Sequence, residues 1–270
     1  ARFKGKLKPE AINAMRESFG LTNDPILVQY TSYLKGIFQG ELGTSIAYFP
    51  EPVSEIIGRG LYWTIFLAGS SMIIAFTIGT TLGIIIAWNR TGRLDTLLPP
   101  ALAFFGAFPY FWLAMVFLYI FGFSMNWFPI GRAYGNEINP GLNLPFLLSA
   151  LYHAFLPALT LVFVSLGGWM LSMRNTMIST LGSDYITFAN AKGIPSRLIM
   201  LRYAARNAIL PNLTGFGMAL GFMLSGALLT EMIFSYPGQG FLLLQAVTSQ
   251  DYPLMQGIFM TITFAVLGAN

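Results

Sequence analysis

Cysteine is absent from this 270-residue chain, and histidine occurs only once, at position 153. The lack of cysteine excludes a disulfide framework and a thiolate metal site. A single histidine cannot form a histidine cluster, so we expect His153 to be structural rather than a metal ligand or a proton relay. The sequence therefore predicts no metal site and no catalytic residue.

Charge is also scarce, at 10% of the residues, while 55% of the residues are hydrophobic. This balance is unusual for a soluble globular protein. Four long stretches lack Asp, Glu, Lys and Arg altogether: 61–89, 96–131, 138–173 and 207–230. Because a spanning helix needs about 20 mainly apolar residues, the sequence predicts an all-α, polytopic helical membrane protein. The aromatic residues lie within or beside the apolar runs, so a nucleic-acid surface is not expected.

The apolar runs predict five membrane spans, near 61–88, 98–122, 152–173, 208–230 and from Tyr252 to Asn270. The last run is short and ends with the chain, and the first residue is not Met. We therefore expect trimming at both ends and a missing N-terminal span, six spans in all. Pro109 and Pro157 should kink their helices, and Gly79 and Gly83 should allow close helix packing.

Two domains are expected: an outer segment at 1–60 and a transmembrane domain at 61–270. The outer segment should form amphipathic helices over 10–19 and 25–38, packed against the spans. The loops near 90–93 and 174–207 are basic, whereas those at 124–150 and 231–253 are not. Since basic loops stay in the cytoplasm, the first pair should be cytoplasmic and the second pair should lie outside.

The loop at about 174–207 contains a predicted short helix. Ser183 is placed to cap it, Asp184 suits its first turn, and Gly193 followed by Pro195 should end it. A helix of two to three turns is marginal alone and needs a surface to bind. Tyr185 and Phe188 offer apolar anchors, and small residues such as Ala189 would let the helix enter a groove.

Several segments then resemble a known family. The chain carries, in order, Asp184-Tyr185, Ala189-x-Ala191-Lys192-Gly193, Arg206-Asn207-Ala208, Leu210-Pro211, Glu231-x-x-Phe234-Ser235-Tyr236-Pro237-Gly238-x-Gly240 and Asp251-Tyr252-Pro253. This set is similar to the B-type permease subunits of dipeptide/oligopeptide ABC importers, whose cytoplasmic EAA motif forms a coupling helix. The general EAA pattern begins with Glu where this chain has Phe188.

The resemblance implies an ABC type I importer fold in a prokaryotic plasma (inner) membrane. It implies four kinds of partner: a second permease subunit, two cytoplasmic ATPase subunits, an extracytoplasmic substrate-binding protein and the lipid bilayer. ATP and Mg would bind in the partners, because this chain has no phosphate-binding loop of the Gly-x-x-x-x-Gly-Lys-Ser/Thr type. It also implies these ATPase-coupling residues: Asp184, Tyr185, Phe188, Ala189, Ala191, Lys192 and Gly193.

The outer end of the fourth span has a second group of candidates. Pro-Gly-x-Gly predicts a tight turn there, and the resemblance implies a possible outer gate at Glu231, Phe234, Tyr236, Pro237 and Gly238. Glu231 and Asp251 have two readings, as buried gating charges or as solvated interfacial residues.

Other functions remain open at this point. A gradient-driven secondary transporter or a channel would favour charges deep inside the spans, and an intramembrane enzyme would need a catalytic constellation there. Within ABC importers, peptides are the expected cargo, with oligosaccharides and nickel chelates as alternatives.

Overall fold

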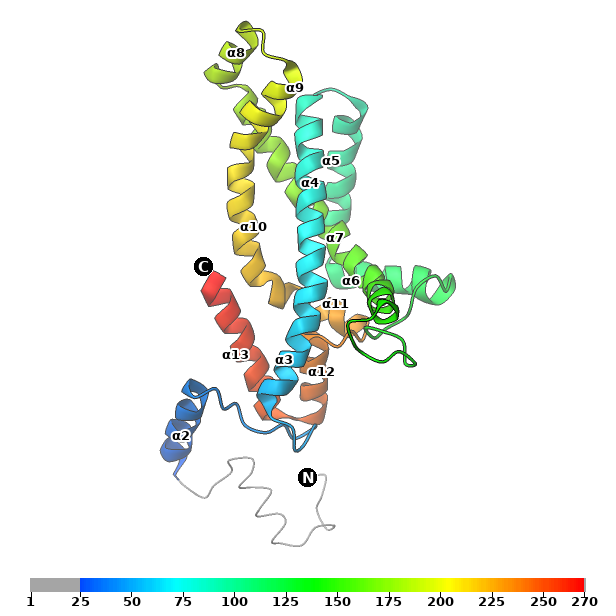
Figure 1. Ribbon diagram of the computed structural model, residues 1–270, viewed down its shortest axis with the longest axis vertical. Helices are drawn as coiled ribbons and strands as arrows, with labels where there is room; N and C mark the ends of the chain where they lie inside the picture. Colours follow the sequence, from blue (N-terminus) through cyan, green and yellow to red (C-terminus); the bar gives the residue numbers. More distant parts are fainter. Residues whose placement is uncertain (1–24, 270) are drawn as a thin grey trace.

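The computed structural model describes residues 25–269, apart from the side chains of 224–226, and this part of the chain is helical (Figure 1). The β pairing found there is an isolated bridge between Thr44 and Pro52. The expected helix over 10–19 lies outside the described residues. The all-α prediction is confirmed.

Within residues 25–269, two unbroken helices are long and apolar enough to cross a bilayer. The first has 36 residues and combines α3 (Val53–Thr64), the π-helical segment η1 (Ile65–Gly69) and α4 (Ser70–Trp88). The second is α7 (Leu144–Leu181), with 38 residues. Both exceed the roughly 20 residues that a crossing requires, so they extend beyond the hydrocarbon. The predicted boundary at 60/61 falls inside the first helix, which begins at Val53.

The predicted span at 98–122 is a broken helix rather than a straight one. α5 (Arg93–Gly106) is followed by α6 (Tyr110–Phe117) and the π-helical segment η2 (Leu118–Ser124), and the two arms are bent by 96°. Pro109 precedes α6 with an extended backbone, because proline cannot supply the N–H that would continue α5. Pro157, in contrast, lies inside α7 without ending it.

The bent pair still carries the chain from one side to the other. Asp95 at its start is paired with Arg174 near the C-terminal end of α7. Beyond its end, the Arg132 N–H donates to the Phe234 carbonyl, and α7 then starts at Leu144. The pair therefore forms one broken crossing.

The remaining helices form the C-terminal third of the chain. The cytoplasmic loop holds α8 (Asp184–Ala191), α9 (Ser196–Leu198) and the π-helical segment η3 (Ile199–Ala205). α10 (Arg206–Gly226), α11 (Leu228–Ile233), α12 (Gln239–Ser249) and α13 (Tyr252–Ala269) follow. The predicted span at 208–230 is thus interrupted at Ala227, and α13 is apolar but shorter than a full crossing.

Small residues hold the long helices together, as the sequence predicts. A Cβ on Gly83 would lie 2.7 Å from the Met170 carbonyl oxygen, and one on Gly79 would lie 2.9 Å from that of Leu166. The backbones of α4 and α7 can therefore approach closely only with glycine there. Buried Ile86, Met170 and Leu102 extend this contact to α5.

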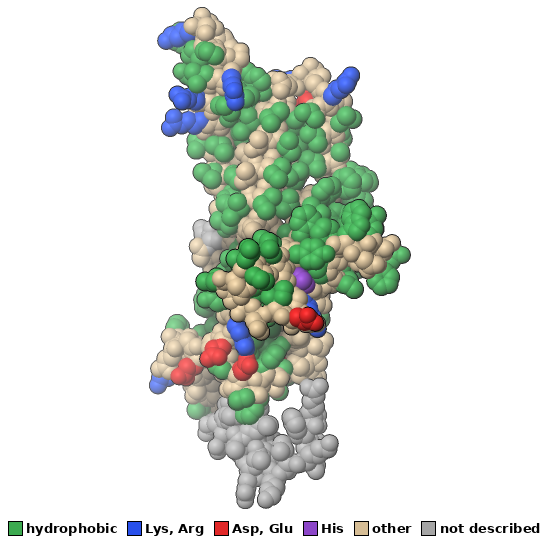
Figure 2. Space-filling model, turned by 45° about the vertical axis from the view of Figure 1, so that its right-hand side comes forward, with side chains coloured by type: hydrophobic (Ala, Val, Ile, Leu, Met, Phe, Trp, Pro, Cys, Tyr) green, Lys and Arg blue, Asp and Glu red, His purple; other side chains and the backbone are tan. Residues whose placement is uncertain are grey.

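The two basic loops that are predicted to be cytoplasmic lie at the same end of the molecule. Figure 2 shows Lys and Arg side chains gathered at the end that carries α8 and α9, above a broad apolar middle. The exposed cations at this end are Arg90, Arg93, Lys192, Arg197, Arg202 and Arg206. By the positive-inside rule, this end is cytoplasmic.

The second predicted outer helix forms, but its packing differs from the expectation. α2 (Ile26–Phe38) lies beside the outer end of the molecule (Figure 1), and none of its described residues is buried. Ile26 and Phe38 are 84% and 89% exposed. The expectation that this helix packs against the spans is therefore wrong for this chain alone.

Candidate coupling site

The predicted coupling helix is α8, and its ends follow from local sequence. Gly193 takes φ +73°, a left-handed conformation that favours glycine, and the Ile194 N–H returns to the Ala189 carbonyl. Ser183 is the N-cap residue, but within the described residues its hydroxyl makes no capping hydrogen bond. Its backbone carbonyl accepts from the Ile186 N–H instead.

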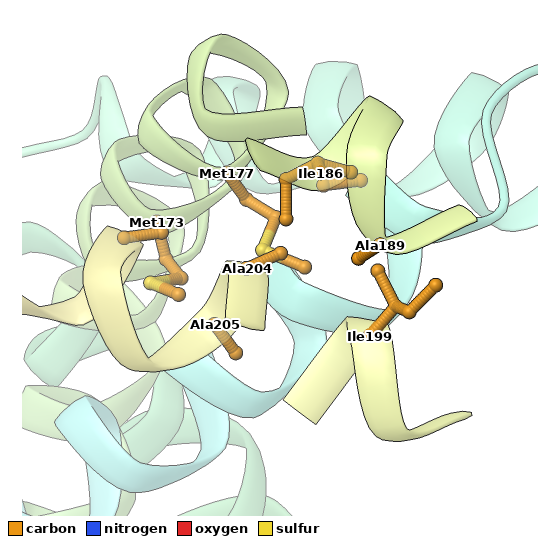
Figure 3. Close-up of a cluster of buried hydrophobic side chains, with 9 residues drawn as sticks. Met173, Met177, Ile186, Ala189, Ile199, Ala204 and Ala205 are labelled. Atoms are coloured by element: carbon orange, nitrogen blue, oxygen red, sulfur yellow. The ribbon is translucent and has the colours of Figure 1, made fainter. Parts of the chain in front are cut away.

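One face of α8 is buried against its own chain. Ile186 and Ala189 are 2% and 3% exposed. Figure 3 shows them meeting Met177 of α7 and two residues of η3, Ile199 and Ala204. This packing supplies the stability that an eight-residue helix lacks in isolation, and it joins α8 to the cytoplasmic ends of α4, α7 and α10.

A neighbouring face of α8 is aromatic and exposed. Tyr185 and Phe188 are 41% and 62% exposed. The Lys192 ammonium lies 4.6 Å from the centre of the Phe188 ring, a cation–π distance. Asn207 donates from Nδ2 to the Tyr185 hydroxyl at 3.1 Å, which fixes that ring against the start of α10. Asp184, Ala191 and Gly193 are also exposed.

The structure thus divides the predicted coupling residues into two groups. Tyr185, Phe188 and Lys192 face outward, where a partner could reach them. Ala189 does not project into a partner's groove as expected, because its methyl group packs on η3. Asn207, absent from the predicted set, belongs to the site through its bond to Tyr185.

An ion pair near the cytoplasmic side links two membrane helices. Arg174 Nε lies 2.6 Å from an Asp95 carboxylate oxygen, and the two side chains are only 24% and 12% exposed. Nearby, Arg90 donates to the Ile178 carbonyl at 3.0 Å. These contacts tie the start of α5 and the end of α4 to α7, immediately before the coupling helix.

The outer candidates gather in a buried cluster between α11 and α12, which we call the outer cluster. Phe234 and Tyr236 are 1% and 0% exposed, and Glu231 is 0% exposed. The Gly240 N–H donates to Glu231 Oε2 at 2.7 Å, whereas Oε1 has no hydrogen-bond partner among the described residues. Pro237 and Gly238 form the turn itself, in which the Gly238 N–H reaches the Tyr236 carbonyl at 2.7 Å.

The outer cluster is hydrogen-bonded to the outer part of the first long helix. The Gln239 N–H donates to the Thr64 hydroxyl at 2.8 Å, and its side-chain amide donates to the Ile57 carbonyl at 2.7 Å. Tyr236 meets the Trp63 ring edge-on at 5.7 Å. The five predicted gate residues are therefore brought together.

Asp251 lies in a second buried contact on the outer side. It is 0% exposed, and it accepts from the Ser45 hydroxyl and, at 2.9 Å, from the Ala47 N–H. Burial raises the pKa of the nearby Tyr48, whose hydroxyl donates to Gln245. The reading of Glu231 and Asp251 as solvated interfacial residues is wrong.

His153 fits the structural reading. Its Nδ1 lies 2.8 Å from the Ser149 carbonyl oxygen one turn earlier in α7. Across residues 25–269, groups of three or more His, Cys, Asp or Glu suited to a metal ion are not found.

Residues 79–270 match the model of the family described as binding-protein-dependent transport system inner membrane component. The chain belongs to this family. The match accounts for the type I ABC importer fold of a multi-pass membrane protein, and the component is a membrane subunit rather than an enzyme.

Relatives of this transport component match along nearly all of its length. It is 35% identical to the dipeptide transport system permease protein DppB of Alkalihalophilus pseudofirmus, covering 96% of this chain and 81% of the relative. It is 34% identical to the probable D,D-dipeptide transport system permease protein DdpB of Escherichia coli K12, covering 96% and 80%. It is 33% identical to the oligopeptide transport system permease protein AppB of Bacillus subtilis, covering 97% and 81%.

Proposed function

We propose that this chain is a permease subunit of an ATP-driven importer of di- and oligopeptides in a prokaryotic inner membrane. It would form half of the translocation pathway with a second permease subunit. Two cytoplasmic ATPase subunits would drive it, and an extracytoplasmic binding protein would deliver the cargo. The names of its relatives favour peptides over oligosaccharides and nickel chelates.

The observation that carries this proposal is the shape of α8. It is a short helix held rigidly from behind by Ile186 and Ala189, and it presents Tyr185 and Phe188 outward at the cytoplasmic end. Exposed aromatic residues are frequent anchors in protein interfaces. Since the chain lacks a phosphate-binding loop, the energy source is expected to dock here.

The scarcity of charge in the apolar runs argues against a gradient-driven transporter. A proton or ion relay needs intramembrane charges that can exchange protons or ions, whereas 61–89, 96–131, 138–173 and 207–230 contain no Asp, Glu, Lys or Arg. ATP-dependent uptake is therefore preferred over uptake on an ion gradient.

The test is peptide uptake by the complete complex in proteoliposomes, with and without ATP. Phe188→Ala should weaken ATPase docking by about 2 kcal/mol, or about 30-fold in affinity, because it removes an aromatic anchor. Uptake should fall accordingly. Phe123→Ala is the matched control, since Phe123 is similarly exposed, at 66%, but lies in η2.

Two results would contradict the proposal. Uptake that continues on an ion gradient without ATP would support a secondary transporter. An unchanged ATPase affinity in Phe188→Ala would remove α8 as the docking site.

A further inference from the structure

A cavity of about 230 Å³ opens between the long helices, and its lining includes none of the residues assigned to the coupling helix or to the outer cluster. Its walls come from η1 and α4, from α7 and from the outer half of α10, and Tyr110 closes one side. Ser71 lies near the middle of the 36-residue helix and Ser165 near the middle of α7. The cavity is therefore well inside the membrane-crossing part of the molecule.

Three interruptions of helical structure meet at this cavity. Ala68 belongs to the π-helical segment η1, Tyr110 is the first residue after the 96° bend, and Ala227 separates α10 from α11. π-Helical segments occur frequently at functional sites, and broken helices in transporters commonly surround the substrate near the bilayer midplane. Simple bundle packing does not require all three to converge.

The lining suits a cargo of variable side chains. The described residues around the cavity include no Asp, Glu, Lys, Arg or His. Trp169 and Phe222 give apolar walls, and Ser165 and Tyr110 expose hydroxyl groups. The Ser71 hydroxyl is already committed to the Leu67 carbonyl at 2.6 Å. Apolar walls with a few polar groups are typical of small-molecule sites.

A second cavity adjoins this one. Met223 lines the first cavity and also lines the second, which has a volume of about 520 Å³ and lies between α3, η1, α10 and α13. The Met223 sulfur lies near η1, 3.6 Å from the position that a Cβ on Gly69 would take. This flexible side chain thus borders both cavities.

We infer that the cavity bounded by Ser71, Tyr110, Ser165 and Phe222 contacts the peptide during its passage, with Met223 at its border with the second cavity. The uncharged lining would accept peptides of either charge and bind none of them tightly. This inference rests on the proposed function and adds the residues that meet the cargo.

The absence of cysteine from the chain allows a direct test. Ser165→Cys is assembled into a complex whose other subunits are also cysteine-free, and its reaction with N-ethylmaleimide is followed in proteoliposomes. The cargo probe is an equimolar mixture of di- to pentapeptides, supplied with the binding protein and ATP. Peptide should slow labelling about five-fold, since a pocket covers most of a bound ligand's surface.

Thr81→Cys is the control within the same membrane, because Thr81 is exposed on α4 and does not line the cavity. Its labelling rate should not respond to peptide. If Ser165→Cys fails to assemble, Tyr110→Cys carries the same test from the facing wall.

Other outcomes would overturn the inference. Labelling of Ser165→Cys that ignores peptide, while the same vesicles take up peptide with ATP, would leave the proposed function intact and remove the cavity from the pathway. Slow labelling with or without peptide would indicate filling by lipid or by another subunit. Absence of ATP-driven uptake in the cysteine-free complex would contradict the proposed function as well.

Discussion

Gly193 holds the backbone of the coupling loop in a conformation that other residues adopt at a cost. Its φ of +73° ends α8, and a side chain there would add about 1–2 kcal/mol of strain. Gly193→Val should therefore shift α8 and lower peptide uptake, while the assembled complex still hydrolyses ATP. The ratio of peptide transported to ATP hydrolysed measures the effect.

The control for this substitution is Gly168→Ala. Gly168 lies in α7, and the described atoms leave open space around a Cβ built there. An equal loss of coupling in both variants would contradict a specific role for the left-handed turn.

The Glu231 backbone carbonyl accepts from the Tyr236 N–H, and the Glu231 side chain joins the outer cluster by accepting from the Gly240 N–H. Glu231→Ala would leave that buried N–H without its acceptor, which costs about 1–3 kcal/mol. Glu231→Gln retains an oxygen acceptor and removes the charge, whose burial is itself unfavourable. The alanine variant should unfold at a lower temperature than the glutamine variant, as measured by thermal denaturation of the purified complex.

A role for the Glu231 charge itself would give a different pattern. If Glu231→Gln lost as much stability as Glu231→Ala, the hydrogen bond to Gly240 would not be the main contribution.

At the scale of elements, the pair between Asp95 and Arg174 fixes α5 against α7. Removing one partner of a buried ion pair costs about 3–5 kcal/mol, and this pair, whose side chains are 24% and 12% exposed, should cost less. Asp95→Asn should therefore reduce the thermal stability of the complex and its uptake. Exchanging the partners, as Asp95→Arg with Arg174→Asp, should recover part of the loss.

A double-mutant comparison decides whether the two residues act as a pair. If Asp95→Asn and Arg174→Gln lowered the stability independently and additively, the ion pair would not be the link between these helices.

The existence and limits of α8 could be predicted from the sequence, because a terminating Gly193 and the following Pro195 act locally. The direction that α8 faces could not. It depends on Ile199 and Ala204, which reach Ile186 and Ala189 only after the chain turns back. The small residues of α8 therefore suggested a face free to enter a partner's groove, whereas in the structure Ala189 packs inside its own chain.

The bend before α6 was predictable only in part. Pro109 indicates an interruption, but the 96° angle depends on the tertiary structure around α5 and α6. Burial of Glu231 could not be predicted from local patterns for a similar reason. The outer cluster around it includes a hydrogen bond from Gln239 to Thr64, which lies 175 residues earlier in the chain.

At the scale of the whole molecule, contacts between residues distant in sequence hold each of its two ends together. Contacts of α8 with α7 and η3 close the cytoplasmic end. Bonds from Gln239 to Thr64 and Ile57, and from Ser45 to Asp251, close the outer end. Between them lie the long helices and the cavity that we assign to cargo contact.

α7 connects these two ends as one uninterrupted helix. Its 38 residues form one continuous helix with a contour length of about 57 Å at 1.5 Å per residue, and Pro157 lies inside it without ending it. If this helix tilts as a unit about a point near Ser165, its two ends move in opposite directions. Widening on the cytoplasmic side would then accompany narrowing on the outer side, so a leak open to both sides at once would be disfavoured.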